Sequence, residues 1–133
     1  MQTQIICDTH ILIFWQDDPK RLSNAAQSAI ETGLNDKTLA CADISFWEIA
    51  MLMHSGRLRN DISPVHYMSD LCLALSLTVL PITPEIASLS QESFFHHNDP
   101  ADRLIAATAI YHNAPLITAD KKLKKLEPLT VIW

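Results

Sequence analysis

Short apolar runs alternate with longer amphipathic segments along this chain. The runs are rich in residues that favour β-strands, and we predict strands at residues 4–7, 38–42, 78–82, 115–118 and 129–133. Most segments between them repeat apolar residues at three and four positions, which predicts helices at residues 19–33, 43–56, 63–77, 83–94 and 99–113. We predict no separate helix or strand at residues 9–18, and we predict that residues 119–127 form a connection.

Capping residues support most of these helix boundaries. Ser63 before Pro64, Thr83, and Asp99 before Pro100 are typical first residues of helices. The helix at 43–56 would begin at Asp43 or Ser45. The two glycines of the chain, Gly33 and Gly56, are expected to end the helices that precede them.

Alternating strands and helices favour a parallel sheet that helices cover on both faces. We therefore predict a three-layer α/β/α sandwich with a parallel, roughly five-stranded sheet. Residues 1–133 contain no repeat, linker or low-complexity tract, and are expected to form a single domain.

The composition is that of an ordinary globular domain, with 48% hydrophobic residues and 19% charged residues among 133. No apolar run approaches the roughly 18 residues of a membrane span, and the N-terminus does not resemble a signal peptide. We expect a cytoplasmic protein. Cys7, Cys41 and Cys72 lack the spacing of a disulfide framework or a zinc site, and are predicted to be reduced core residues.

Acidic residues end two of the predicted strands. Asp8 follows the first strand and Asp120 follows the strand at 115–118. Ligands of open parallel sheets bind beyond the carboxyl ends of the strands, so the two carboxylates would converge there if these strands are neighbours. The alternative is that each aspartate only caps a helix that follows it.

Three further acids lie in or beside predicted helices. Glu48 follows a mostly apolar stripe and needs a partner if buried; a metal ion, a buried arginine or partial exposure would each satisfy it. Asp102 shares a helix face with Ile105, Ala106 and Ala109, so it is expected to point inward. Asp99 fits the position of a helix cap, and metal binding is the second interpretation of this residue.

Clustered carboxylates repel one another unless a cation neutralises them. Oxygen ligands suit Mg²⁺ or Mn²⁺ better than zinc, and such ions assist water attack on phosphorus. The chemistry that these acids indicate is the hydrolysis of phosphodiester bonds.

An ordered set of motifs resembles one family along nearly the whole chain. "DTHIL" at Asp8, "ISFWEIA" around Glu48, "GRL" from Gly56, "DPADRLIAATA" around Asp102, "LITAD" ending at Asp120 and the terminal "VIW" occur in that order. The chain resembles PIN-domain ribonucleases, and more narrowly VapC-type toxins of toxin–antitoxin pairs. It departs from the pattern at Ala101, where a bulky apolar residue is common, and at Met53, where a lysine is often found.

The resemblance implies a site and partners. The catalytic acids would be Asp8, Glu48, Asp102 and Asp120, and these together with Asp99 would bind Mg²⁺ or Mn²⁺. Thr9 and Thr118 match supporting hydroxyl positions. The substrate would be RNA, and the chain would form a homodimer and bind a cognate antitoxin in an apolar groove, for which Phe14, Trp15 and Trp47 are candidates; the alternative for each is core packing.

A net charge of −5 argues against a protein that coats nucleic acid by charge alone. The basic residues are clustered, however, and we predict RNA contacts from Arg57, Arg59, Lys121 and Lys122, unless these are ordinary exposed turn residues.

Two rival functions stay open at the level of sequence. A phosphoacceptor receiver domain also carries acids at strand ends, but Asp8 stands alone and the strand at 78–82 is followed by Thr83. A non-catalytic PIN-like binding module is the second rival. Neighbouring His96 and His97 in "HHND" are expected to be solvent-facing loop residues, because side chains of adjacent residues in an extended loop point apart.

Overall fold

A computed structural model describes residues 3–133. Its centre is a sheet of five parallel strands in the order β3-β2-β1-β4-β5. The strands are short, and their bounds are β1 Ile5–Cys7, β2 Leu39–Ala42, β3 Thr78–Leu80, β4 Leu116–Ile117 and β5 Val131–Ile132. Each lies inside a run that the sequence predicts to be a strand.

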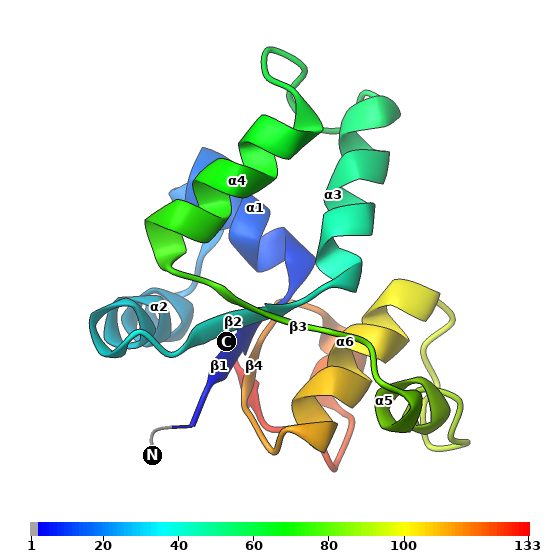
Figure 1. Cartoon of the computed structure of the whole chain (residues 1–133). Coiled ribbons are helices and arrows are strands. Elements are labelled where there is room, and N and C mark those ends of the chain that lie inside the picture. The colour runs from blue at the N-terminus through cyan, green and yellow to red at the C-terminus, as the bar shows by residue number, and fades with distance from the viewer. Residues whose placement is uncertain (1–2) are drawn as a thin grey trace.

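Helices cover both faces of the sheet, which confirms the predicted three-layer architecture (Figure 1). Their bounds are α1 Thr9–Asp17, α2 Asn24–Asp36, α3 Ile44–His54, α4 Pro64–Leu75, α5 Pro84–Leu89, α6 Pro100–Tyr111 and α7 Lys121–Lys124, with a 3-10 turn at Pro19–Arg21. Helices α1 to α4 pack on one face, and α5, α6 and α7 pack on the other. Within the described residues, no helix has both the length and the apolar character needed to cross a membrane.

Both faces of the central strands are buried. In β1, Cys7 packs into the core beneath α1 to α4, whereas its neighbour Ile6 packs into the core beneath α5 and α6. This arrangement explains why the strands read as continuous apolar runs instead of alternating polar and apolar positions. Cys7 and Cys41 are buried and all three cysteines are free, as predicted.

The sequence pattern missed two helices, α1 and the short α7, which lies in the segment predicted to be a connection. Residues 11–15 are all apolar and look like a continuation of the first strand. Asp8 instead ends the strand, adopts extended backbone angles and accepts a hydrogen bond from the backbone N–H of Thr9, so that a helix begins directly after it. The next helix, α2, is capped by Ser23 and not by a residue near Pro19.

The expectation that α2 ends at Gly33 is wrong. The helix continues to Asp36, and Lys37 ends it in the left-handed region at φ 57°. Gly33 is needed for close packing, since a Cβ atom there would lie 2.5 Å from Cδ2 of Leu39. Gly56 does follow the end of α3, at φ 76°, as expected.

The other predicted caps have mixed outcomes. Ser63, Thr83 and Asp99 cap α4, α5 and α6 through their side chains. Asp43 precedes α3 but makes no side-chain cap. Its carboxylate accepts a hydrogen bond from the backbone N–H of Ile82 instead, which ties the end of β2 to the segment after β3.

The strand order creates one switch point. From β1 the chain first adds β2 and β3 on one side, and later adds β4 and β5 on the other. Helices that leave β1 and β4 at their carboxyl ends therefore diverge, and ligands of such sheets bind in the crevice between them. Asp8 and Asp120 follow these two strands, whose pairing had been assumed in predicting that the two acids meet.

Candidate active site

Asp8 lies at the centre of a hydrogen-bonded chain of side chains. Its Oδ1 accepts the backbone N–H of Thr9 at 2.7 Å, and its Oδ2 accepts the hydroxyl of Thr118 at 2.6 Å. The Thr118 hydroxyl also accepts the backbone N–H of Asp120 at 3.1 Å. Thr118 therefore joins the two acids that follow neighbouring strands.

Thr9 extends this chain to Glu48. The Thr9 hydroxyl donates to Oε1 of Glu48 at 2.6 Å and lies 2.8 Å from the hydroxyl of Ser45. Glu48 is only 6% exposed. Its buried carboxylate is satisfied by the Thr9 hydroxyl and not by an arginine. The sequence places Ser45 three residues before Glu48, on the same face of α3, but the pattern assigned it no role beyond that of a possible cap.

The remaining acids come from the start of α6. Asp99 caps the helix through Oδ1, which accepts the backbone N–H groups of Ala101 and Asp102. Asp102 points inward on the face that carries the fully buried Ile105, Ala106 and Ala109, as expected. Oxygen atoms of Glu48, Asp99 and Asp102 lie within 4.8 Å of one another.

The expectation that His97 faces solvent is wrong. Its side chain is 11% exposed, and Nε2 lies 2.8 Å from Oδ2 of Asp120 and 3.1 Å from Oδ2 of Asp102. His96 is exposed. The two adjacent side chains do point apart, as expected for an extended loop, and this places one histidine inward while the other is exposed.

One path of contacts thus runs through all four predicted catalytic acids. It passes in the order Glu48, Thr9, Asp8, Thr118, Asp120, His97 and Asp102. The structure brings these residues into one crevice from five separate segments of the chain. It also places Thr9 and Thr118, the predicted supporting residues, between acids.

Crowding of negative charge changes the ionisation of this site. Burial raises the pKa values of Asp8 and Glu48, against the hydroxyl donors Thr118 and Thr9, which lower them. Burial, followed by the charges of Asp8, Asp99 and Glu48, raises the pKa of Asp102 to about 8. Burial also raises the pKa of Asp120, but hydrogen bonds from His97 and Lys122 outweigh it and leave that pKa below its ordinary value.

The raised pKa of Asp102 indicates that the site can bind a cation. At neutral pH the metal-free site holds a proton that an exposed aspartate would have lost. A cation would favour the ionised form and displace that proton. Glu48, Asp99 and Asp102 are also the acids that keep one oxygen free of hydrogen bonds from residues 3–133. The arrangement therefore fits a hard divalent cation bound by oxygen atoms.

The predicted basic residues have different surroundings. Arg59 donates to Asp61 and Asp17, and these hydrogen bonds raise the pKa of its guanidinium. Asp17 ends α1, whereas Asp8 precedes it, so Arg59 lies at the opposite end of that helix from the acids. Lys121 and Lys122 are exposed at the start of α7, directly after Asp120.

A pocket of about 330 Å³ adjoins the acids on the side of α7. His97 lines it together with Phe94, Phe95, Lys122 and Leu126. The rings of Phe94 and Phe95 are stacked with centroids 4.6 Å apart. This pocket combines aromatic surface with positive charge beside the acidic crevice.

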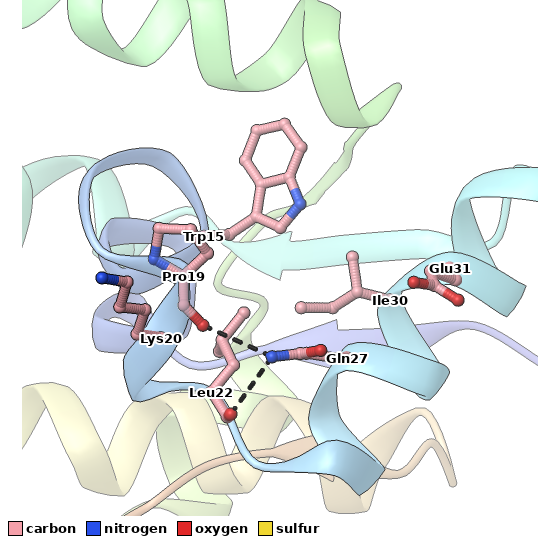
Figure 2. A pocket seen from close by; sticks show the side chains of 7 residues that line it. All are labelled: Trp15, Pro19, Lys20, Leu22, Gln27, Ile30 and Glu31. Atoms are coloured by element: carbon pink, nitrogen blue, oxygen red, sulfur yellow. Dashed lines mark hydrogen bonds between the residues drawn. The ribbon is translucent and has the colours of Figure 1, made fainter.

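The three residues predicted to line an antitoxin groove also have different surroundings. Phe14 is 8% exposed and packs in the core beneath the guanidinium of Arg21, so core packing is the correct description for it. Trp47 is 58% exposed on α3. Trp15 is half-buried and overhangs a second pocket of about 330 Å³ between α1 and α2 (Figure 2). Pro19, Leu22 and Ile30 form the apolar part of that pocket, and Gln27 hydrogen-bonds across its base.

A parallel α/β sheet with clustered carboxylates at its switch point is suited to binding a divalent cation, and hydrolases that act on phosphate esters are one class of protein that uses such ions. The chain belongs to the PIN domain family, whose profile matches residues 5–128. It is 38% identical to Ribonuclease VapC22 of Mycobacterium tuberculosis over 124 residues, which cover 92% of this chain and 91% of that protein. The resemblance to VapC-type PIN domains that the sequence motifs indicate is thereby confirmed.

Solved structures agree with the fold. DNA-bound VapBC from Salmonella typhimurium superposes with a TM-score of 0.69 at 14% identity, covering 98% of this chain and 97% of that one. VapBC2 from Rickettsia felis, bound to a DNA fragment from its promoter, superposes with a TM-score of 0.67 at 20% identity, covering 97% of both chains. At these identities the similarity shows the PIN-like fold and leaves the activity to be argued from the site.

Proposed function

We propose that this protein is an endoribonuclease toxin of the VapC type, which hydrolyses RNA phosphodiester bonds and is neutralised by a cognate antitoxin. The observation that carries the proposal is the convergence of Glu48, Asp99 and Asp102, with oxygen atoms within 4.8 Å of one another, beside the buried Asp8. The 38% identity to a ribonuclease over nearly the whole chain supports RNA as the substrate.

The cation would be Mg²⁺ or Mn²⁺, because the donors that converge are carboxylate oxygens. When bound, such an ion supplies a more acidic water and positive charge beside the phosphate. Glu48, Asp99 and Asp102 would hold it directly through their free oxygens. Asp8 and Asp120, the other predicted ligands, accept hydrogen bonds at both oxygens, and the remaining lone pairs of these carboxylates could bind the same ion.

The protein groups have distinct roles in this proposal. Asp8, Glu48, Asp102 and Asp120 are the proposed catalytic acids, since one path of close contacts joins all four. Thr9 and Thr118 keep the carboxylates in place through hydrogen bonds of 2.6 Å to Glu48 and Asp8. Burial of these threonines excludes water from behind the acids.

RNA contacts are proposed for Lys121 and Lys122, which flank the crevice through α7. Arg57 and Arg59 stay candidates, although Arg59 would have to leave Asp17 and Asp61 to bind a phosphate. For the antitoxin, Trp15 and Trp47 are the proposed contacts. We further propose a single PIN domain over residues 1–133, a homodimer and a cytoplasmic location.

The proposal is tested by RNA cleavage with the purified chain. We expect cleavage with Mg²⁺ or Mn²⁺ and none after chelation. Glu48→Gln should lower the rate by about 100-fold or more, because it removes a charged ligand. Glu85→Gln, an exposed glutamate on α5, is the matched control and should retain the rate of the parent.

Two results would contradict the proposal. Cleavage that persists in chelator would exclude the cation. RNA binding without cleavage at any cation concentration would instead identify a non-catalytic binding module. A receiver domain is already disfavoured, because β3 is an edge strand and is followed by Pro81, Ile82 and Thr83 without an acceptor aspartate.

A further inference from the structure

The segment between α5 and α6 that carries His97 is held in place by α6. Arg103 Nε donates to the carbonyl of Ser90 at 2.8 Å, and its Nη1 donates to the carbonyls of Phe95 and His97 at 3.2 Å each. The guanidinium also lies 5.5 Å from the centre of the Phe95 ring. The backbone at His97 is therefore fixed relative to the helix that carries Asp102.

A second contact sets the tautomer of the ring. The backbone N–H of Asp99 donates to Nδ1 of His97 at 3.1 Å. A ring nitrogen that accepts a hydrogen bond carries no proton, so the proton of the neutral ring is on Nε2. That N–H is directed at the two carboxylate oxygens of Asp120 and Asp102, at 2.8 and 3.1 Å.

Nε2 of His97 and the oxygens of Asp102 and Asp120 lie within 4.8 Å of one another, as the ligands of a metal would. A nitrogen that carries a proton has no free electron pair in the ring plane to give to a metal. The N–H donor instead does part of what a cation would do, because its partial positive charge reduces the repulsion between the oxygens of the two acids. Glu48 and Asp99, on the other side of Asp102, meet no such donor from the described chain at their free oxygens.

We propose that His97 takes the place of a second divalent cation between Asp102 and Asp120, so that the active site binds one cation per chain. The inference rests on the proposed cation-dependent activity and specifies how many ions serve it. His97 is a positioning residue in this arrangement, since it orients Asp102 and Asp120 and does not contact the cation.

The test counts Mn²⁺ ions bound to the full chain, by titration with the electron paramagnetic resonance signal of free Mn²⁺ as the readout. We expect one ion per parent chain and two per chain for His97→Ala, a twofold rise in stoichiometry. His97→Gln keeps an N–H donor near the position of Nε2 and should return the count to one. His96→Ala, which changes the exposed neighbour, is the matched control and should also bind one.

Two ions bound by the parent chain, or one ion bound by a folded His97→Ala chain, would overturn the inference while leaving the cation-dependent activity intact. Absence of Mn²⁺ binding by the parent would overturn both.

A second measurement needs no variant. Electron spin echo spectra of Mn²⁺ bound to the parent chain should lack the ¹⁴N modulation of a directly coordinated imidazole, and its presence would make His97 a ligand and overturn the inference.

Discussion

The two oxygens of Asp99 have different surroundings, and so the residue can be tested for two roles separately. Oδ1 caps α6 through the backbone N–H groups of Ala101 and Asp102. Oδ2 accepts no hydrogen bond from residues 3–133, and one oxygen of Asp99 lies within 4.8 Å of oxygens of Glu48 and Asp102. A helix cap needs an acceptor oxygen but no charge, whereas a cation ligand benefits from the charge.

Asp99→Asn should therefore retain stability but lose cation affinity. Asparagine caps helices as well as aspartate, so we expect the free energy of unfolding without metal to stay within about 0.5 kcal/mol of the parent. Mn²⁺ affinity should fall by about tenfold. Calorimetric titration and thermal melts measure the two effects.

Asp99→Ala is the comparison that separates cap from ligand. It removes both functions and should cost about 1 kcal/mol of stability in addition to the affinity. Equal Mn²⁺ affinity in the parent and Asp99→Asn would leave Asp99 as a helix cap alone.

The protonation of Asp102 makes metal-free stability depend on pH. Its pKa is raised to about 8 in the folded chain, whereas that of an unfolded aspartate is about 3.9. Between these values the folded chain holds a proton that the unfolded chain has lost, so stability is present at low pH and declines as pH rises. In chelator, we expect a melting temperature about 5 °C higher at pH 5 than at pH 8.

Asp102→Asn removes the titrating group and should flatten most of this dependence. Other acids and histidines of the site still titrate in the variant, and the comparison at each pH isolates the contribution of Asp102. A parent chain that melts higher at pH 8 than at pH 5 in chelator would contradict the raised pKa.

At the scale of elements, close packing decides what happens at Gly33. In an exposed helix, alanine in place of glycine stabilises by about 1 kcal/mol. At this position, the added Cβ would meet Cδ2 and Cγ of the fully buried Leu39 at 2.5 and 2.8 Å. We therefore expect Gly33→Ala to destabilise the fold, by about 1–3 kcal/mol in urea unfolding.

The clash with Leu39 can be relieved from the strand side. In a double-mutant cycle with Leu39→Val, the cost of Gly33→Ala should be smaller than in the parent chain. Strict additivity, or a stabilising Gly33→Ala, would show that α2 does not approach β2 as closely as described.

The same helix shows what sequence patterns can and cannot predict. Periodicity and caps predicted all five strands and most helices, because those signals are local. Gly33 was misread as a stop, since its role depends on Leu39, a contact between α2 and β2 that no local pattern records. Helix α1 was missed because five consecutive apolar residues, buried on several sides, have no helical periodicity.

The residues of the site also divide into those that the sequence predicts and those that it does not. Glu48 and Asp102 were identifiable because charge is unusual on an apolar helix face. His97 was not, because its inward direction depends on Arg103 and on the backbone of Asp99, which hold its segment through hydrogen bonds. The role of Ser45 was not predicted either, because its partner Thr9 lies on the helix that the pattern missed.

At the scale of the whole molecule, a net charge of −5 has to be reconciled with binding to a polyanion. Lys121 and Lys122 place positive charge next to the crevice, at the start of α7. Neutralising both with glutamine should weaken RNA binding and reduce the log–log salt slope by about one to two units, with Mn²⁺ affinity unchanged.

The matched control neutralises Lys20 and Lys37, which are exposed on other surfaces; Lys37 follows α2 at the amino end of β2, away from the crevice. Salt titrations with Ca²⁺, if that ion blocks cleavage, measure both variants. Identical slopes for the parent and the Lys121/Lys122 variant would assign the phosphate contacts to other residues.

The pairing of β1 with β4 also determines how much of the chain must be present before the site can form. Asp8 meets Thr118 across 110 positions of sequence, and Asp120 follows two residues later. The cluster of acids therefore cannot form until residues 118–120 have left the ribosome. For the proposed ribonuclease this order delays activity during synthesis, because a nascent chain without Thr118 and Asp120 has an incomplete site.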